Sequence, residues 1–328
     1  MLLSLWPEKT DLKFMNLRLA GALVSSIMIA ASVFFLATKG LNFGVDFAGG
    51  TVMELEQTET VSVAAVRQAM PLNADVNSAV GTDARRIVVI KFGEADAALL
   101  GEAFRALPAD LQAERATGAT NELVVRTLKE TFGLRDEDIL RNDSVGPKVS
   151  GELFRDGITA LCVALVLMLV YIWFRFEWQF SIGAVAALAH DVIITLGVFA
   201  FLQLEFNLTT IAALLTIIGY SMNDTVVVFD RVREERRKYK KMPDRQVIDL
   251  ALNSTLSRTL LTSGTTLLAL LAIFFLGGPV LRGMSFALIW GIVIGTYSSI
   301  FIASTIVLSL GMNLNKKPIE EDVPGFQG

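Results

Sequence analysis

The chain has 328 residues, of which 53% are hydrophobic and 19% are charged, and its formal net charge is −4. Soluble domains are roughly 45–50% apolar and about 25% charged. The excess of apolar residues lies in long runs, which excludes an ordinary soluble enzyme and a disordered chain. The single cysteine, Cys162, excludes an internal disulfide framework, and the mild acidity gives no indication of nucleic-acid binding.

Six apolar runs are long enough to cross a membrane, which takes roughly 20 residues. The first run is either a signal peptide or an uncleaved anchor. Its length, and the bulky residues Phe34 and Phe35 where a cleavage site would lie, favour an anchor. The sequence therefore predicts a polytopic α-helical membrane protein with helices near residues 17–37, 158–174, 181–202, 208–229, 254–276 and 284–311.

The distribution of lysine and arginine between the loops predicts the orientation. Residues 1–16 and the tail 312–328 both carry lysines, and the hairpin 230–250 holds eight Lys/Arg between Arg231 and Arg245. The links after the third and fifth runs carry one arginine between them. We therefore expect both termini in the cytoplasm. The basic hairpin is either a topology signal on a solvated face or a docking surface for a cytoplasmic partner.

The long segment 38–150 between the first two runs is expected to form a small α+β domain outside the cytoplasm. It contains no histidine and no evident nucleophile–base pairing, which favours a binding or moving element over an enzyme domain. Thr60 is expected to cap a helix over 61–70, and Pro147 to begin the helix of the second span. The pattern predicts strands around Met53 and Leu55, at 76–80, 85–92 and 139–147, and further helices at 95–107 and 119–133.

Ionisable residues within the apolar runs are the strongest functional indication, because a charge at the centre of a spanning helix costs about 2.5–3.5 kcal/mol on insertion scales. Asp224 lies seven residues before Arg231, about 10 Å along a helix, in the cytoplasmic half of the fourth run. Arg258 lies in the fifth run at a similar depth. The two are expected to meet, with Asp224 exchanging a proton when motion separates the pair. One alternative is that Asp224 forms a static, structural ion pair. Another is that the long side chain of Arg258 simply extends to the cytoplasmic interface of the membrane.

His190 and Asp191 lie near the centre of the third run, and His190 is the only histidine in the chain. A histidine beside an aspartate in the membrane suits a proton relay, and a satisfied histidine that fixes helix packing is the alternative. Asn223 lies on the same side of the fourth run as Asp224 and is expected to support the relay. The sequence offers no further cluster of metal-ligating residues, so it gives no indication of a metal site.

Several of these segments together resemble the SecF family of protein-export membrane subunits, which with SecD belongs to the resistance–nodulation–division superfamily. The resemblance covers nearly the whole chain. It is carried by FGVDFAGGT after the first span, the His-Asp pair of the third span, GYSMNDTVVVFDRVRE, SRT in the fifth span and GTYSSIFIAS in the sixth.

The resemblance implies a subunit that works with SecD beside the SecYEG channel and uses the proton-motive force to assist preprotein export, in the inner membrane of a bacterium. It implies that Asp224 and Arg258 are the proton-relay pair, with protons as the coupling ion. Asp46, Phe47, Gly49 and Gly50 match its DFxGG motif, which we interpret as structural because glycine permits tight backbone geometry. Expected partners are SecD, SecYEG, the translocating preprotein and membrane lipids, without a cofactor or an enzymatic reaction.

Two other functions remain open at this point. An exporter of lipids or small molecules would share the charged core, but it would need a substrate cleft in larger external domains. A passive scaffold of the translocon would need Asp224 and Arg258 only for stability. The chain has no GxxxxGK[ST] phosphate loop, so the sequence gives no indication of energy from bound ATP.

Overall fold

The computed structural model describes residues 10–70, 74–80, 86–92 and 109–312. In these residues, six helical stretches are long and apolar enough to cross a membrane, which confirms the predicted fold class. The last stretch is interrupted by a π-helical turn. The helices are α1 (Arg18–Thr38), α6 (Pro147–Arg175), α7 (Trp178–Leu202), α8 (Leu208–Lys238), α9 (Asp244–Leu276), and α10 (Pro279–Ser298) followed by the π-helical turn η4 (Ser299–Ala303) and α11 (Ser304–Leu310).

Several helices extend well beyond the apolar runs that reveal them in the sequence. Pro147 is the first residue of α6, as predicted, and the helix then continues without a break to Arg175. α8 runs on to Lys238 and α9 begins at Asp244, so the basic hairpin is mostly helical, with a short turn between the two helices. Hydropathy identifies only the part of a helix that lies inside the membrane. The helix itself can continue beyond the membrane through polar residues, because its backbone hydrogen bonds do not depend on hydropathy.

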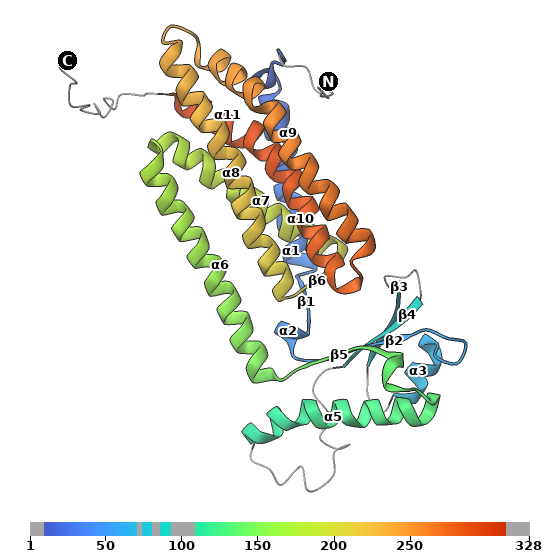
Figure 1. Ribbon diagram of the computed structural model, residues 1–328. Helices are drawn as coiled ribbons and strands as arrows, with labels where there is room; N and C mark the ends of the chain where they lie inside the picture. The colour runs from blue at the N-terminus through green and yellow to red at the C-terminus, as the bar shows by residue number, and fades with distance from the viewer. Residues whose placement is uncertain (1–9, 71–73, 81–85, 93–108, 313–328) are drawn as a thin grey trace, which may run out of the picture.

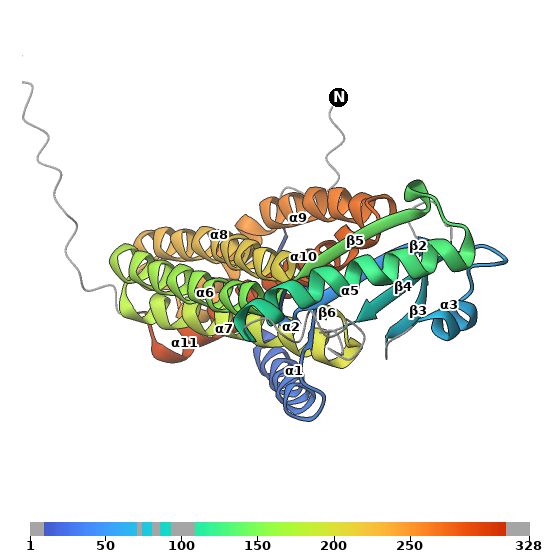
Figure 2. The same cartoon turned by 90° about the horizontal axis from the view of Figure 1, so that it is seen from below.

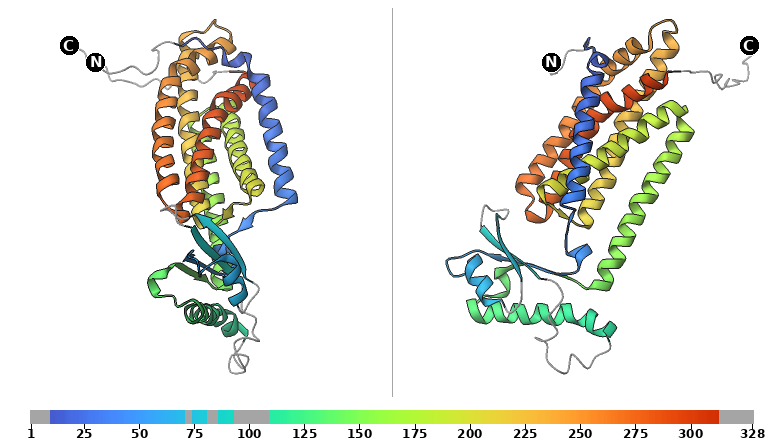
Figure 3. Two further views of the ribbon diagram at one scale, coloured as in Figure 1. Left: turned by 90° about the vertical axis from the view of Figure 1, so that its right-hand side faces the viewer. Right: turned by 180° about the vertical axis from the view of Figure 1, so that it is seen from behind.

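The α+β domain lies beyond one end of the bundle, and the α8–α9 turn lies at the opposite end (Figures 1 and 3). Its sheet is antiparallel in the order β3-β4-β2-β5. α5 (Ala109–Phe132) lies over the face of the sheet turned away from the bundle (Figure 2). The strands are β2 (Gly50–Glu56), β3 (Asp75–Val80), β4 (Arg86–Phe92) and β5 (Ile139–Val145).

The expected strands are confirmed, and the predicted helix 119–133 is the second half of the longer α5. The expected cap at Thr60 is wrong. The helix α3 spans Val63–Ala69, and the Ser62 hydroxyl accepts the hydrogen bond from the amide of Ala65 at 3.2 Å. A serine directly before the first helical residue outcompetes a threonine two positions earlier, because the cap must reach the third helical amide. The helix expected at 95–107 lies outside the described residues.

The domain is attached to the bundle by polar and aromatic contacts. Two short parallel strands, β1 (Asn42–Phe43) and β6 (Glu205–Phe206), join the links that follow α1 and α7. Lys91 at the end of β4 forms an ion pair with Glu205, with 2.7 Å between Nζ and Oε2. Phe47 of the short helix α2 (Val45–Ala48) packs against Phe154 with ring centroids 5.5 Å apart.

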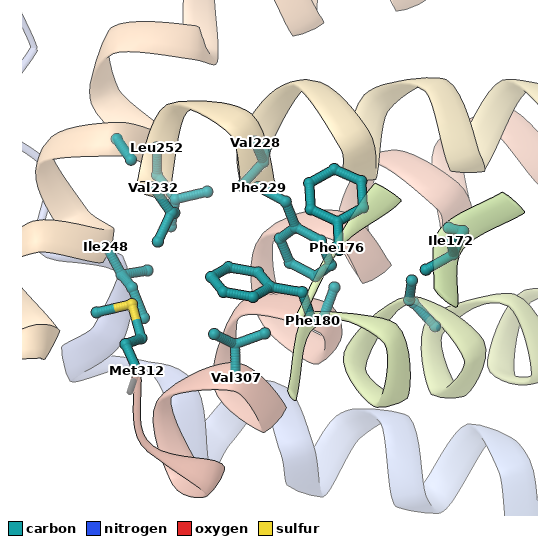
Figure 4. Close-up of a cluster of buried hydrophobic side chains, with 14 of the residues drawn as sticks. Ile172, Phe176, Phe180, Val228, Phe229, Val232, Ile248, Leu252, Val307 and Met312 are labelled. Carbon is teal, nitrogen blue, oxygen red and sulfur yellow. The ribbon is translucent and has the colours of Figure 1, made fainter. Parts of the chain in front are cut away.

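The opposite end of the bundle is held by a buried apolar cluster (Figure 4). Phe176, Phe180 and Phe229 pack edge-to-face or tilted around the turn between α6 and α7. The first and last described segments both attach to the start of α9. The amide of Leu12 donates to Asn253 at 2.9 Å, and the amide of Met312 donates to Asp244 at 3.4 Å. Both ends of the described chain therefore lie at the side of the bundle opposite the α+β domain.

Candidate functional site

Asp224 lies inside the bundle where α8, α9 and the final span converge. It is 8% exposed, and both of its carboxylate oxygens are hydrogen-bonded. Thr259 of α9 donates to Oδ1, and Ser299 of the π-helical turn donates to Oδ2, each at 2.5 Å. Short hydrogen bonds to an ionised acceptor are among the stronger ones in proteins. The two hydroxyls therefore give this carboxylate the polar surroundings that it requires in the membrane.

Arg258 is not the direct partner that the sequence suggested. Both residues are in the described chain, and neither an ion pair nor a hydrogen bond joins Arg258 to Asp224, although Arg258 is close enough to act on it electrostatically. The reason is helix geometry, because neighbouring residues point about 100° apart around the axis. Since Thr259 points inward to Asp224, Arg258 points to the outside of the bundle and is exposed.

Further polar residues accompany Arg258 on the outside of α8 and α9. Asn223 is exposed and so lies apart from the buried surroundings of its neighbour Asp224. A polar strip at membrane depth is unfavourable against lipid and usually faces a water-filled cavity or another protein. We call this surface the polar strip; it consists of Thr216, Asn223, Arg258, Thr262 and Thr265, all exposed.

His190 and Asp191 form a second buried polar site on α7, and they are only 2% and 1% exposed. The ring Nδ1 of His190 lies 2.9 Å from Oδ1 of Asp191, and Nε2 lies 3.1 Å from the hydroxyl of Ser25 on α1. Asp191 Oδ2 accepts hydrogen bonds from Ser221 of α8 at 2.6 Å and from Ser298 of α10 at 2.8 Å. Four helices thus meet at this pair.

Sequence reasoning did not assign the hydroxyl residues that surround the two carboxylates. Thr259, Ser298 and Ser299 lie in apolar helices, where hydroxyl residues commonly bond to their own backbone, so single positions carried no distinct indication. A usable feature existed, however. The run GTYSS puts four hydroxyl side chains within residues 296–299 of an otherwise apolar span. Such a local concentration is unusual enough to predict a polar contact between helices.

The DFxGG motif lies at the junction between the domain and the bundle. Asp46 Oδ2 accepts the amide of Leu208 at 2.9 Å, so it caps the start of α8 together with Asn207. Gly49 and Gly50 have φ angles of +73° and +111°, a region that side chains disfavour, and they turn the chain from α2 into β2. This geometry agrees with a structural function for the motif.

Within the described ranges, no group of three or more His, Cys, Asp or Glu side chains is placed to hold a metal ion. Two hollows among the described residues lie at the end of the bundle that holds the α8–α9 turn. One of these, of about 570 Å³, is lined by Arg175, Asp230, Arg233 and other charged residues of the basic hairpin.

Comparison with known proteins identifies what this architecture is similar to. The family model "Protein export membrane protein SecD/SecF, C-terminal" matches residues 124–313, and the model "SecD/SecF GG Motif" matches residues 34–57. The protein translocase subunit SecF of Cereibacter sphaeroides is 46% identical over 95% of this chain and 93% of its own length. SecF of Vibrio alginolyticus is 42% identical over 93% of this chain and 91% of its own length.

Solved structures are also similar to this chain. The crystal structure of SecDF from Thermus thermophilus, described as a translocon-associated membrane protein, is 34% identical with a TM-score of 0.76. The alignment covers 93% of this chain but only 39% of that longer chain. A crystal structure of SecDF in a super-membrane-facing form gives a TM-score of 0.64 at the same identity and coverage.

Proposed function

Since this chain belongs to the SecD/SecF family of protein-export membrane proteins, we propose that it is the proton-driven accessory subunit that assists preprotein export at the Sec translocon. Its expected setting is the bacterial inner membrane, with both termini in the cytoplasm and the α+β domain on the far side. Its proposed partners are SecD, the SecYEG channel and the translocating preprotein. Protons are the proposed coupling ion, and no cofactor is part of the proposal.

The buried Asp224 is the observation that carries this proposal. A carboxylate held by two hydroxyls inside a membrane bundle is the kind of group that takes up and releases a proton. One charge that crosses 100 mV releases about 2.3 kcal/mol. That energy corresponds to a change of about fiftyfold in a two-state equilibrium, since each 1.4 kcal/mol is about tenfold.

Arg258 has a gating role in this proposal. In this proposal, a rotation of α9 about its axis, by up to the roughly 100° between neighbouring residues, brings Arg258 beside Asp224 in place of Thr259. Ionisation of Asp224 would favour the approach of the Arg258 cation, and protonation would remove that attraction. The proposal therefore links the charge on one carboxylate to the rotation of one helix. His190 and Asp191 are the proposed supporting residues inside the bundle, and Asn223 is the proposed supporting residue on the polar strip.

The polar strip supports the assignment of a membrane partner. Against lipid, Arg258 and Asn223 would have no hydrogen-bond partner among the described residues, whereas the threonines of the strip bond to carbonyls of their own helices. A second bundle with polar residues of its own would cover the strip and complete the polar core. We propose that SecD supplies this second bundle, because the similar SecDF structure is a longer chain of which this chain covers 39%.

A continuous helix provides a route from the proton site to the external domain. Asp224 lies 16 residues after Leu208, so α8 spans about 24 Å between the carboxylate and its capped end. Asp46 of the domain junction makes that cap. A shift of α8 on proton exchange would therefore act directly on the base of the domain, where preprotein release is proposed to occur.

The experiment is preprotein translocation into inverted membrane vesicles that contain the complex, with and without a protonophore. Asp224→Asn should remove the proton-dependent part of export, because an amide cannot carry the proton, while the complex still assembles with SecD. Asp230→Asn is a matched control, since this residue is on the same helix at the bundle end, where it pairs with Arg175. It should leave proton-dependent export intact.

Undiminished proton-dependent export by an assembled Asp224→Asn complex would refute the motor function. Arg258→Lys keeps a positive charge but lacks the planar guanidinium, so it should retain part of the activity that Arg258→Gln loses. Undiminished export by Asp224→Asn, Arg258→Lys and Arg258→Gln, with only their thermal stability lowered, would instead support a passive scaffold.

A further inference from the structure

The hydrogen bonds around His190 indicate how many protons this buried pair holds. The hydroxyl of Tyr297 lies 2.6 Å from the carbonyl oxygen of Gly21, and a carbonyl can only accept, so Tyr297 donates. The contact of 3.1 Å between the hydroxyls of Ser25 and Tyr297 therefore uses the proton of Ser25. Since Ser25 has no second proton, its contact of 3.1 Å with Nε2 requires that His190 donates from Nε2.

The other ring nitrogen requires a proton as well. Nδ1 of His190 and Oδ1 of Asp191 are 2.9 Å apart, and without a hydrogen between them two lone pairs would face each other. Either His190 is an imidazolium beside a carboxylate, or a neutral imidazole accepts from a protonated Asp191. Both arrangements are neutral overall. A pair with one proton fewer would have to give up the bond from Ser25 to Tyr297 or the bond to Asp191.

The surroundings of the pair agree with a neutral unit. In the part of the chain that the structure describes, no lysine or arginine makes an ion pair or hydrogen bond with either residue. Tyr297 is the ionisable side chain that reaches the pair, through Ser25, and its ring stacks on that of His190 with centroids 6.1 Å apart. α8 and α10 contribute the neutral hydroxyls of Ser221 and Ser298.

Two successive serines connect this pair to the proton site at Asp224. Ser298 donates to Asp191, and Ser299 donates to Asp224; both serines are fully buried. Each hydroxyl also lies near a carbonyl of its own helix. Ser298 is 3.1 Å from the carbonyl oxygen of Gly295, and Ser299 is 3.0 Å from that of Thr296. A hydroxyl has one proton, so each serine donates either to a carboxylate or to its helix.

The backbone at this point is also irregular. Ser299 begins the π-helical turn, and its carbonyl oxygen accepts a hydrogen bond from the hydroxyl of Ser304 at 3.1 Å. Single π-helical turns inside α-helices occur frequently at functional sites. The backbone that follows Ser298 is therefore not held by the regular α-helical pattern of hydrogen bonds.

We propose that the His190–Asp191 pair is a second proton-binding site, and that the Ser298–Ser299 step couples its proton occupancy to that of Asp224. When a carboxylate takes up a proton, it donates to the serine, and the serine turns its own proton to the helix carbonyl. This reorients the π-helical turn and changes the donor offered to the other carboxylate. The coupling rests on the proposed proton cycle at Asp224, whereas the proton content of the pair does not.

The chain offers a direct spectroscopic test because His190 is its only histidine. Isotope-labelled histidine in the full chain, with its partner in lipid nanodiscs, gives a single imidazole whose two nitrogen resonances report their protonation by NMR. At neutral pH we expect Nε2 to be protonated. An unprotonated Nε2 would overturn the second proton site, since Ser25 would then be the donor.

The coupling is tested by the same resonances in variants. Asp224→Asn imitates the protonated carboxyl group and should shift the His190 resonances, and Ser299→Ala should abolish that shift in the double variant. Ser309→Ala is the matched control, because among the described residues this exposed serine bonds only to the carbonyl of Thr305 on its own helix. It should leave the shift unchanged. Ser299→Thr keeps the hydroxyl, so the shift caused by Asp224→Asn should persist in this double variant.

The outcomes separate the two hypotheses. Resonances that do not respond to Asp224→Asn, or that respond equally with and without the Ser299 hydroxyl, would overturn the coupling. If Nε2 is protonated and the shift is transmitted while Asp224→Asn leaves proton-dependent export undiminished, the second proton site and its connection stand and the motor function fails. If Asp224→Asn abolishes proton-dependent export but does not shift the His190 resonances, the motor function stands and the coupling to the second proton site is overturned.

Discussion

The close approach of α10 to α8 determines whether Ser299 can reach Asp224, and Gly291 permits this approach. A β-carbon at Gly291 would lie 2.3, 2.4 and 2.8 Å from three side-chain atoms of Ile217 on α8. Ordinary contacts begin at 3.4 Å, so Gly291→Ala requires the helices or Ile217 to move by about 1.1 Å. Ile217 is only 1% exposed and β-branched, so it has little freedom to turn aside.

Overpacking of this size costs about 1–3 kcal/mol, which lowers the folding equilibrium roughly fivefold to over a hundredfold. The measurement is equilibrium unfolding in mixtures of mild and denaturing detergent. Gly264→Ala is the control, because nothing lies within 4 Å of the position of its β-carbon in α9. It should be neutral or stabilising, since alanine favours helix over glycine by up to about 1 kcal/mol.

A double-mutant cycle isolates the contact itself. Ile217→Ala alone should cost about 2–5 kcal/mol because it leaves a cavity. In the double variant the new methyl group occupies part of that space. The stability lost in the double variant should therefore be smaller than the sum of the two single losses by at least about 1 kcal/mol. Strict additivity, or a Gly291→Ala variant as stable as Gly264→Ala, would refute the assignment of this glycine as the spacer of the proton site.

Two further predictions concern the junction of the domain with the bundle. Asp46→Ala should destabilise the start of α8 by about 1 kcal/mol, measured as faster amide exchange at Leu208. Asp46→Asn should have less effect because it keeps an acceptor. Unchanged exchange in the alanine variant would contradict the cap. Lys91→Glu should loosen the sheet from the bundle and the added change Glu205→Lys should restore it, seen as a wider and then a narrower distribution of distances between spin labels on the two parts. The pair is about one-third exposed, so its coupling should stay below about 1 kcal/mol; a reversed pair that fails to restore the narrow distribution would show that the contact does not hold the domain.

Some features of the site were predictable because they depend on local composition. Asp224, His190 and Asp191 are charged or ionisable residues in apolar runs, and the cost of exposing such groups to lipid requires that they turn inward or toward a partner. The burial of these three residues agrees with that requirement, while their roles in proton transfer stay predictions. The existence of Asp224 as an intramembrane acid thus follows from the sequence alone.

The contacts of that acid did not follow from the sequence. Arg258 and Thr259 are neighbours, and either could point inward from the sequence pattern, since the choice depends on the rotation of α9 about its axis. That rotation is fixed by packing along the whole helix, including the attachment of its first turns to the N-terminal segment through Asn253.

The sequence by itself therefore determined the number of apolar helices, the separate α+β domain and the presence of acids at membrane depth, because hydropathy and strand alternation are local properties. Only the tertiary structure decided that Asp224 bonds to Thr259 and Ser299, and that Ser298 bonds to Asp191. These partners lie 30 or more residues apart along the chain. They meet because small residues such as Gly291 let the helices approach, and long-range packing of this kind leaves no local pattern.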